Sequence, residues 1–175
     1  MKTDAIQIRE LEPADAQAYQ RLRLAALREI PSAFCSTDAE EAGIPIATIA
    51  ERLAANPNRC MLGAWRDTEL VGMLGLQREQ LEKLAHKAYI WGVYVAPQVR
   101  QLGVGRQLME RAVARASTMG GLRQINLGVN AANPAAIALY EAAGFTSFGL
   151  ERGFMLIDGE LHDELHMVRA ISPGS

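Results

Sequence analysis

One stretch of the sequence constrains the fold more than any other. It runs from Val93 to Arg106 and reads VYVAPQVRQLGVGR. Aromatic and β-branched residues from Tyr89 to Val95 favour a strand, and Pro97 ends it because proline has no N–H to donate to a sheet. A helix is expected after the two glycines, because apolar residues around and beyond them recur at helical spacing and give it one buried face. Those apolar residues are Leu102, Leu108, Met109, Ala112, Val113 and Ala116.

A strand, a glycine-bearing loop and a helix in this order form a site for an anion. Gly103 and Gly105 let backbone approach backbone closely, and the first N–H groups of a helix have no partner inside it. These free donors and the positive end of the helix dipole favour a phosphate. Arg100 and Arg106 add fixed positive charge on either side of the turn. The stretch therefore predicts a diphosphate site, and the plainer alternative is a strand-to-helix turn that uses glycine for tightness.

Two common diphosphate motifs do not fit this stretch. The phosphate loop G-x-x-x-x-G-K-[ST] does not occur, and the dinucleotide fingerprint G-x-G-x-x-G lacks its third glycine, where Leu108 stands. The residues Arg100-x-x-Gly103-x-Gly105 instead resemble the acetyl-CoA-binding motif [RQ]-x-x-G-x-[GA] of the GNAT superfamily of N-acetyltransferases. Gln101 stands where many members have glycine. Since a phosphate needs only the backbone N–H there, we expect glutamine to be tolerated.

A second segment resembles another signature of the same superfamily. Residues 130–145 read NAANPAAIALYEAAGF and match N-x-x-A-x-x-L-Y-x-x-x-G-F. The two signatures occur in the family's order, with a predicted strand between them. The positions that match the second signature are Asn133, Ala136, Leu139, Tyr140, Gly144 and Phe145.

The chain in order predicts a mixed α/β fold around one sheet, with the order β-α-α-β-β-β-α-β-α-β-β of the GNAT fold. A length of 175 residues without linkers or repeats predicts a single domain over residues 1–175. Helices are expected over 13–29, 46–55 and 134–143 and after Gly105, and residues 31–45 are expected to be irregular. Arg21, Arg23 and Arg28 are expected to point outward from the first helix. Strands are expected at 6–9, 59–65, 70–76, 89–95, 125–129, 145–157 and 161–170.

Charge and cysteine content exclude several classes of partner. The formal charge of −2 gives no general attraction to nucleic acid or to an anionic membrane. The N-terminus lacks an apolar signal core, and no run of residues is long enough to span a bilayer. Cys35 and Cys60 are isolated, so neither a metal site nor a disulfide framework is expected. Cytoplasmic residence follows by default, and the sequence leaves a homodimer open.

The resemblance implies acetyl-CoA as the acyl donor, held without a metal. The central strand would pair with the pantetheine amides and polarise the thioester carbonyl, while the loop would hold the diphosphate. Asn133 is a helix cap by its sequence context, and in the family this asparagine also contacts the pantetheine or its surroundings. The implied cofactor-binding residues are Val93, Tyr94, Val95, Arg100, Gln101, Leu102, Gly103, Val104, Gly105, Arg106, Asn133 and Tyr140.

Acyl transfer to an amine needs a neutral amine, a polarised carbonyl and a proton for the departing thiolate. Tyr140 resembles the family's general acid, since a tyrosine with an ordinary pKa near 10 is protonated at neutral pH and can donate to sulfur. Packing of its ring is the plainer role. The base is left open between an ordered water and several side chains. Those side chains are Glu79, Glu82, His86, Glu151, Glu164 and His166.

The sequence does not identify the acceptor. A small amine, an amino acid, an aminoglycoside-like drug and a protein N-terminus all fit. The acidic residues Asp38, Glu40 and Glu41 either attract a cationic amine or form a solvated loop. Two rival functions remain open: a regulatory module that binds CoA without catalysis, which Tyr140 disfavours, and an NAD- or nucleotide-binding domain, which the absent third glycine disfavours.

Overall fold

The computed structural model describes residues 5–172. Within them, seven strands form one sheet with the order β1-β2-β3-β4-β5-β7-β6. Neighbouring strands are antiparallel except for β4 and β5, which are parallel. The strands are β1 (Ile6–Glu10), β2 (Arg59–Arg66), β3 (Glu69–Arg78), β4 (Lys87–Val95), β5 (Gln124–Asn130), β6 (Thr146–Ile157) and β7 (Glu160–Ala170).

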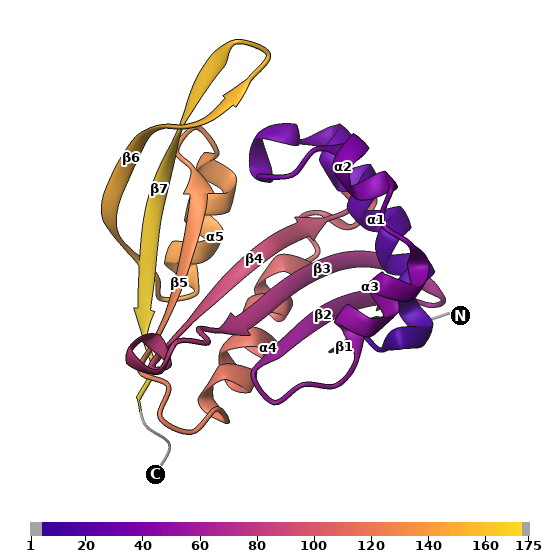
Figure 1. Ribbon diagram of the computed structural model, residues 1–175, viewed down its shortest axis with the longest axis horizontal. Helices are drawn as coiled ribbons and strands as arrows, with labels where there is room; N and C mark the ends of the chain where they lie inside the picture. The colour runs from indigo at the N-terminus through magenta and orange to yellow at the C-terminus, as the bar shows by residue number, and fades with distance from the viewer. Residues whose placement is uncertain (1–4, 173–175) are drawn as a thin grey trace.

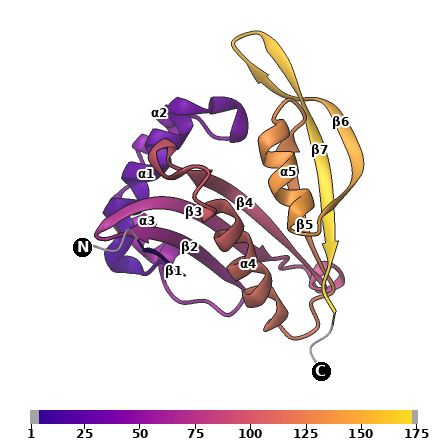
Figure 2. The ribbon, with the colours of Figure 1, turned by 180° about the vertical axis from the view of Figure 1, so that it is seen from behind.

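Helices cover both faces of this sheet (Figures 1 and 2). Helices α1, α2 and α3 lie on one face, whereas α4 lies on the other, on the same side as α5. This arrangement confirms the predicted mixed α/β fold, with one helix more between β1 and β2 than expected. The α-helices of the described chain are α1 (Ala16–Glu29), α2 (Asp38–Ala42), α3 (Ile46–Leu53), α4 (Val104–Ser117) and α5 (Pro134–Ala142).

The additional helix, α2, lies in the segment that the sequence predicts to be irregular. Thr37 caps it, because its hydroxyl oxygen accepts from the N–H of Glu40 at 3.2 Å while the Glu40 carboxylate accepts from the N–H of Thr37 at 2.7 Å. This reciprocal pair is a capping box, which satisfies two orphan donors of a helix N-terminus. The prediction for 31–45 is therefore wrong over 38–42, where capping stabilises a turn that has little apolar surface.

The core lies between the sheet and its two helical layers. Strand β3 is buried on both faces because α1 and α4 pack against it from opposite sides, and α4 also packs against β2. Each fully buried leucine or methionine contributes roughly 1.5–3 kcal/mol. Side chains with 0% exposure include Leu62, Leu74, Leu76, Leu108 and Met109.

Two side chains do not lie where helical spacing places them. Arg23, expected to point outward, is only 6% exposed, because its guanidinium turns inward to pair with Glu41 of α2. Leu102, expected on the apolar face of α4, is 59% exposed. The helix begins two residues later, at Val104, so helical spacing does not apply to Leu102.

The parallel strands β4 and β5 separate after a short paired segment. Residues 87–89 of β4 pair with residues 124–126 of β5, and beyond them the strands diverge (Figure 1). Gly92 has a φ of +62° at a register shift against β3, which is a β-bulge. Within the described chain, residues 90–95 have no strand partner on the β5 side. The divergence therefore leaves main-chain donors and acceptors available at the centre of the sheet.

Candidate functional site

A groove of about 550 Å³ opens between the end of β4, the first turn of α4 and α5. Of the predicted cofactor-binding residues, Leu102 alone does not line it. Three apolar side chains that complete its walls, Ile30, Phe34 and Leu139, were not predicted as binding residues. Ile30 was expected to face inward at the end of the first helix. Phe34 is an aromatic residue in the segment expected to be irregular, and this isolation is the signal that could have found it. The predicted residues that line the groove are Val93, Tyr94, Val95, Arg100, Gln101, Gly103, Val104, Gly105, Arg106, Asn133 and Tyr140.

The first turn of α4 forms one end of the groove. The N–H of Gln107 donates to the carbonyl of Gly103 at 3.0 Å, which is the first bond of the helix, so the N–H groups before it have no helical partner. Gly103 adopts a left-handed φ of +77° as the N-cap. A Cβ on Gly105 would lie 3.1 Å from Leu139 Cδ2, so glycine lets α4 approach α5 closely. The geometry is that of an anion site.

The loop before α4 keeps its shape without a glycine at its second position. Gln101 has a φ of +65°, the left-handed conformation that costs a non-glycine residue roughly 1–2 kcal/mol. Its N–H still belongs to a loop that lines the groove. At the mouth, the Arg106 side chain is 79% exposed and pairs with Glu110 one turn along the helix, at 2.7 Å. Arg106 thus adds positive charge where the loop meets solvent.

Arg100 has a different role from Arg106. Its Nε donates to the carbonyl oxygen of Val95 at 2.9 Å, and its Nη2 lies 2.9 Å from the Glu29 carboxylate. The same carboxylate accepts a hydrogen bond from the Tyr94 hydroxyl. Burial, together with that bond, raises the pKa of Tyr94 to about 12. Arg100 therefore connects the loop to β4 and α1 through these contacts, and its positive charge is paired with Glu29.

The backbone of β4 faces the groove at alternate residues. The N–H of Ala96 donates to the carbonyl of Val71 on β3 at 2.8 Å. Because successive residues of a strand direct their main-chain groups to opposite sides, those of Val93 and Val95 point away from β3. They lie along the part of β4 that has separated from β5. An extended ligand in the groove could pair with them as a neighbouring strand does.

Tyr140 lies at the inner end of the groove. It is 7% exposed, and its ring packs edge-on against Phe145 with 6.4 Å between the ring centres. Burial raises the pKa of its hydroxyl above the ordinary value, and no hydrogen bond within residues 5–172 contributes to that shift. Tyr140 also lines a second cavity, of about 70 Å³, between the diverging strands β4 and β5. Tyr140 therefore belongs to the walls of both cavities, and its raised pKa keeps the hydroxyl protonated at neutral pH.

The base candidates fall into two groups. On β6 and β7, His166 Nε2 lies 3.0 Å from Glu151 and its Nδ1 lies 3.9 Å from Glu164. Glu164 lies over Gly128 of β5, a wall of the cavity between β4 and β5, and burial raises the pKa of its carboxyl. The second group precedes β4 and consists of Glu79, Glu82 and His86. None of the six candidates lines either cavity at Tyr140.

The acidic residues of α2 are committed to partners within the protein. Asp38 accepts from Arg28 Nε at 2.9 Å, and Glu40 completes the capping box. Glu41 accepts from Arg23 Nη2 at 2.7 Å. These carboxylates therefore stabilise α2 and its contact with α1, and do not form the solvated loop or the open anionic surface that the sequence left as alternatives.

Two kinds of feature are absent from the described residues. Across residues 5–172, no group of three or more histidine, cysteine, aspartate or glutamate side chains is arranged as metal ligands would be. No helix in the same range combines the length and the apolar character needed to cross a membrane.

Comparison with known proteins adds to this geometry. The sequence profile of the acetyltransferase (GNAT) family matches residues 12–145. The L-amino acid N-acetyltransferase AaaT of Escherichia coli (strain K12) is 28% identical over 167 residues, which cover 94% of this chain and 97% of that protein. The N-alpha-acetyltransferase RimI of Mycobacterium tuberculosis is 33% identical over 109 residues, which cover 62% of this chain and 65% of that protein.

A solved structure shows the same fold. The GNAT superfamily phosphinothricin acetyltransferase (Pat) from Sinorhizobium meliloti, solved in complex with AcCoA, matches with a TM-score of 0.81 at 20% identity. The match covers 100% of this chain and 91% of that one. Together with the profile match over 12–145, it leads to one conclusion: the chain belongs to the GNAT family of acetyltransferases.

Proposed function

We propose that the protein transfers the acetyl group of acetyl-CoA to a primary amine by direct attack in a ternary complex. The observation that carries this proposal is the position of Tyr140, buried and protonated where the groove meets the cavity between β4 and β5. A proton donor there lies at the inner end of a groove whose outer end is an anion site. Acetyl-CoA has the matching order of groups, with the thioester at one end and the diphosphate further along the molecule.

The groove has the chemistry that acetyl-CoA needs along its length. The free N–H groups in the first turn of α4 are donors for the diphosphate, with Arg106 nearby. The main-chain groups of Val93 and the N–H of Val95 are available to pair with the pantetheine amides, whereas the Val95 carbonyl accepts from Arg100. Apolar side chains from α5 and the α1–α2 connection complete the walls. These groups support the proposal for the diphosphate and the pantetheine of the donor.

The transfer itself then follows from these groups. The amine nitrogen attacks the thioester carbonyl carbon, and the carbonyl oxygen becomes negative as the C–N bond forms. A backbone N–H of β4 stabilises that oxygen. As the C–S bond breaks, Tyr140 donates its proton to the leaving sulfur and recovers one from the amine through water. The products are an N-acetyl amine and the CoA thiol.

The test combines binding with turnover. Acetyl-CoA should raise the melting temperature, and the shift should grow with its concentration. At 100 times Kd the native state should gain about 2.7 kcal/mol. NAD and ATP should leave the melting temperature unchanged. A panel of primary amines should then release thiol from acetyl-CoA. Stabilisation without thiol release from any amine would favour the non-catalytic regulatory module. No acetyl-CoA-dependent stabilisation at all would refute the proposal.

A charge reversal at the mouth tests the diphosphate end. Arg106→Glu replaces an attractive charge with a repulsive one close to the free N–H groups of α4, and should raise KM for acetyl-CoA about 5- to 30-fold. Arg111→Glu makes the same change on an exposed residue further along α4 and should alter KM less than about twofold. Equal effects from both variants would contradict the assigned position of the diphosphate.

A further inference from the structure

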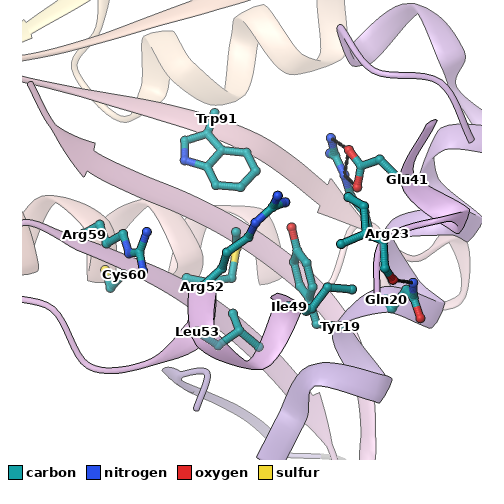
Figure 3. A pocket seen from close by; sticks show the side chains of 12 residues that line it. Tyr19, Gln20, Arg23, Glu41, Ile49, Arg52, Leu53, Arg59, Cys60 and Trp91 are labelled. Atoms are coloured by element: carbon teal, nitrogen blue, oxygen red, sulfur yellow. Dashed lines mark hydrogen bonds and ion pairs between the residues drawn. The ribbon is translucent and has the colours of Figure 1, made fainter. Parts of the chain in front are cut away.

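A small chamber lies on the other face of the sheet from α4, enclosed by α1, α2, α3 and the strands β2 and β4 (Figure 3). Its volume is about 100 Å³. Apolar side chains such as Ile49, Leu53 and Met61 form part of its wall. Three arginines, Arg23, Arg52 and Arg59, also line it, against a single carboxylate, Glu41. The chamber is therefore positively charged and partly apolar.

Arg23 is the most buried of these cations. Its Nε and Nη2 donate to Glu41, and Nη2 also donates to Ser36 at 3.0 Å. Its Nη1 is buried and has no hydrogen-bond partner within residues 5–172. A Cβ on Gly92 would lie 3.6 Å from this Nη1, so the unpaired donor points toward the bulge of β4. Leaving such a donor unsatisfied is costly unless an acceptor atom reaches it.

Glu41 does not neutralise the chamber, because Arg23 already engages it. Burial by itself raises the pKa of the Glu41 carboxyl, but hydrogen bonds from Arg23 and Ser36 outweigh burial and hold the pKa below its ordinary value. Glu41 is thus a stable anion paired with one cation. The positive charges of the other two arginines remain without a counter-charge among the residues that line the chamber.

Arg52 is the cation best placed to meet a ligand. Its side chain extends from α3 into the chamber toward Trp91 (Figure 3). In the part of the chain that the structure describes, it makes no ion pair. Arg59 lies further along the same wall, and its Nε is buried without a hydrogen-bond partner. The chamber therefore offers several guanidinium donors that are ready for an anion.

Trp91 connects the chamber to the site of acetyl transfer. It lines the chamber and also the cavity between β4 and β5, whose wall includes Tyr140. Its indole lies flat on β3, where a Cβ on Gly75 would overlap the ring. A molecule that extends past this indole would have one end among the arginines and the other near Tyr140.

We infer that the chamber binds a carboxylate and that the acceptor is a free amino acid, an inference that rests on the proposed function. The carboxylate pairs with Arg52, and Arg23 and Arg59 add positive charge around it. The α-amine, one carbon away, then lies on the Trp91 side of the chamber, the wall that the chamber shares with the cavity at Tyr140. The same positive charge lowers the pKa of the ammonium group and favours the neutral amine that attacks. A protein N-terminus has no free carboxylate beside its amine and would leave the arginines unpaired.

The test compares acceptors that differ only in the carboxylate. Thiol release from acetyl-CoA is measured with proteinogenic amino acids, their carboxamides and short peptides. The wild-type protein should show kcat/KM about 10- to 100-fold higher for the preferred amino acid than for its carboxamide. Arg52→Gln should remove most of that ratio and change the carboxamide rate less than about threefold. Arg21→Gln, an exposed change on α1, should leave the ratio unaltered.

Arg23 needs a paired substitution, because removing it alone would leave Glu41 buried without its cation. The double variant Arg23→Met with Glu41→Gln removes both charges and should fold. It should also lose the preference for the carboxylate. Equal rates for amino acid and carboxamide in the wild-type protein, or a preference for peptides, would overturn the inference while the proposed function stands. Absence of thiol release with every amine would remove both.

Discussion

Replacing Tyr140 with phenylalanine separates the chemistry of this residue from its packing. The substitution deletes one hydroxyl and keeps the ring that packs against Phe145. The hydroxyl makes no hydrogen bond that contributes to its pKa shift within residues 5–172, so no buried partner is left unsatisfied. We therefore expect the variant to fold as the wild-type protein does.

The expected effects on stability and rate differ widely. Without a lost hydrogen bond, the free energy of unfolding should change by less than about 1 kcal/mol, or about 2–4 °C in Tm for a chain of this size. A positioned general acid contributes about 10²- to 10⁴-fold to the rate. Because the thiolate must leave without that proton, kcat should fall by about this factor. KM for acetyl-CoA should change little.

The assay is thiol release at saturating acetyl-CoA, followed across pH. Since burial raises the pKa of Tyr140, the wild-type rate should show no alkaline decline caused by loss of this proton up to about pH 10. Tyr89→Phe is the matched control, because Tyr89 lies in the paired part of β4 and lines neither cavity at Tyr140. It should keep kcat within about twofold.

One result would refute the reasoning. If Tyr140→Phe retained the wild-type kcat and Tm, its ring would be a packing element and the thiolate would take its proton from water. If kcat and Tm fell together, the hydroxyl would be needed for folding and not for chemistry. The general-acid role is supported only when kcat falls and Tm does not.

Three further predictions concern stability. Gln101→Gly should raise the free energy of unfolding by about 0.5–1 kcal/mol, because glycine adopts the φ of +65° without strain; Asp67→Gly, at a φ of +53° that aspartate tolerates better, should gain less in the same urea titration. Burial raises the pKa of Glu164 in the folded protein, so its carboxylate opposes folding at neutral pH. This penalty fades as pH falls from the raised pKa to the ordinary value of the unfolded chain. Glu164→Gln should therefore be more stable than the wild-type protein at pH 7 and lose that advantage near pH 4. Leu62→Ala, at a residue with 0% exposure, should cost about 2–5 kcal/mol in denaturant unfolding.

Local signals in the sequence account for most of what could be predicted. The cap at Asn133 was predicted from asparagine followed by proline, and its Oδ1 accepts from the N–H of Ala136 at 3.1 Å. The hairpin of β6 and β7 was predicted from Asp158-Gly159, and both residues have positive φ. Each of these features depends on residues within a few positions, which periodicity and turn chemistry describe well.

Features that depend on distant residues could not be predicted in this way. The inward position of Arg23 follows from Glu41, 18 residues away, and no helical spacing encodes that pairing. The separation of β4 from β5 depends on the bulge at Gly92, which alternation of side chains does not reveal. The helix over 38–42 is a different case: its Thr37-x-x-Glu40 capping spacing is present in the sequence and could have been read from it.

The divergence of β4 and β5 gives the sheet a slot that is open to both sides. The groove shares Val93 and Tyr140 with the cavity between these strands, and the arginine-lined chamber shares Trp91 with that cavity. Under the proposed function, acetyl-CoA would occupy the groove and the amine would occupy the chamber, so neither would have to leave before the other binds. Direct transfer between them would then need no acetylated residue on the protein.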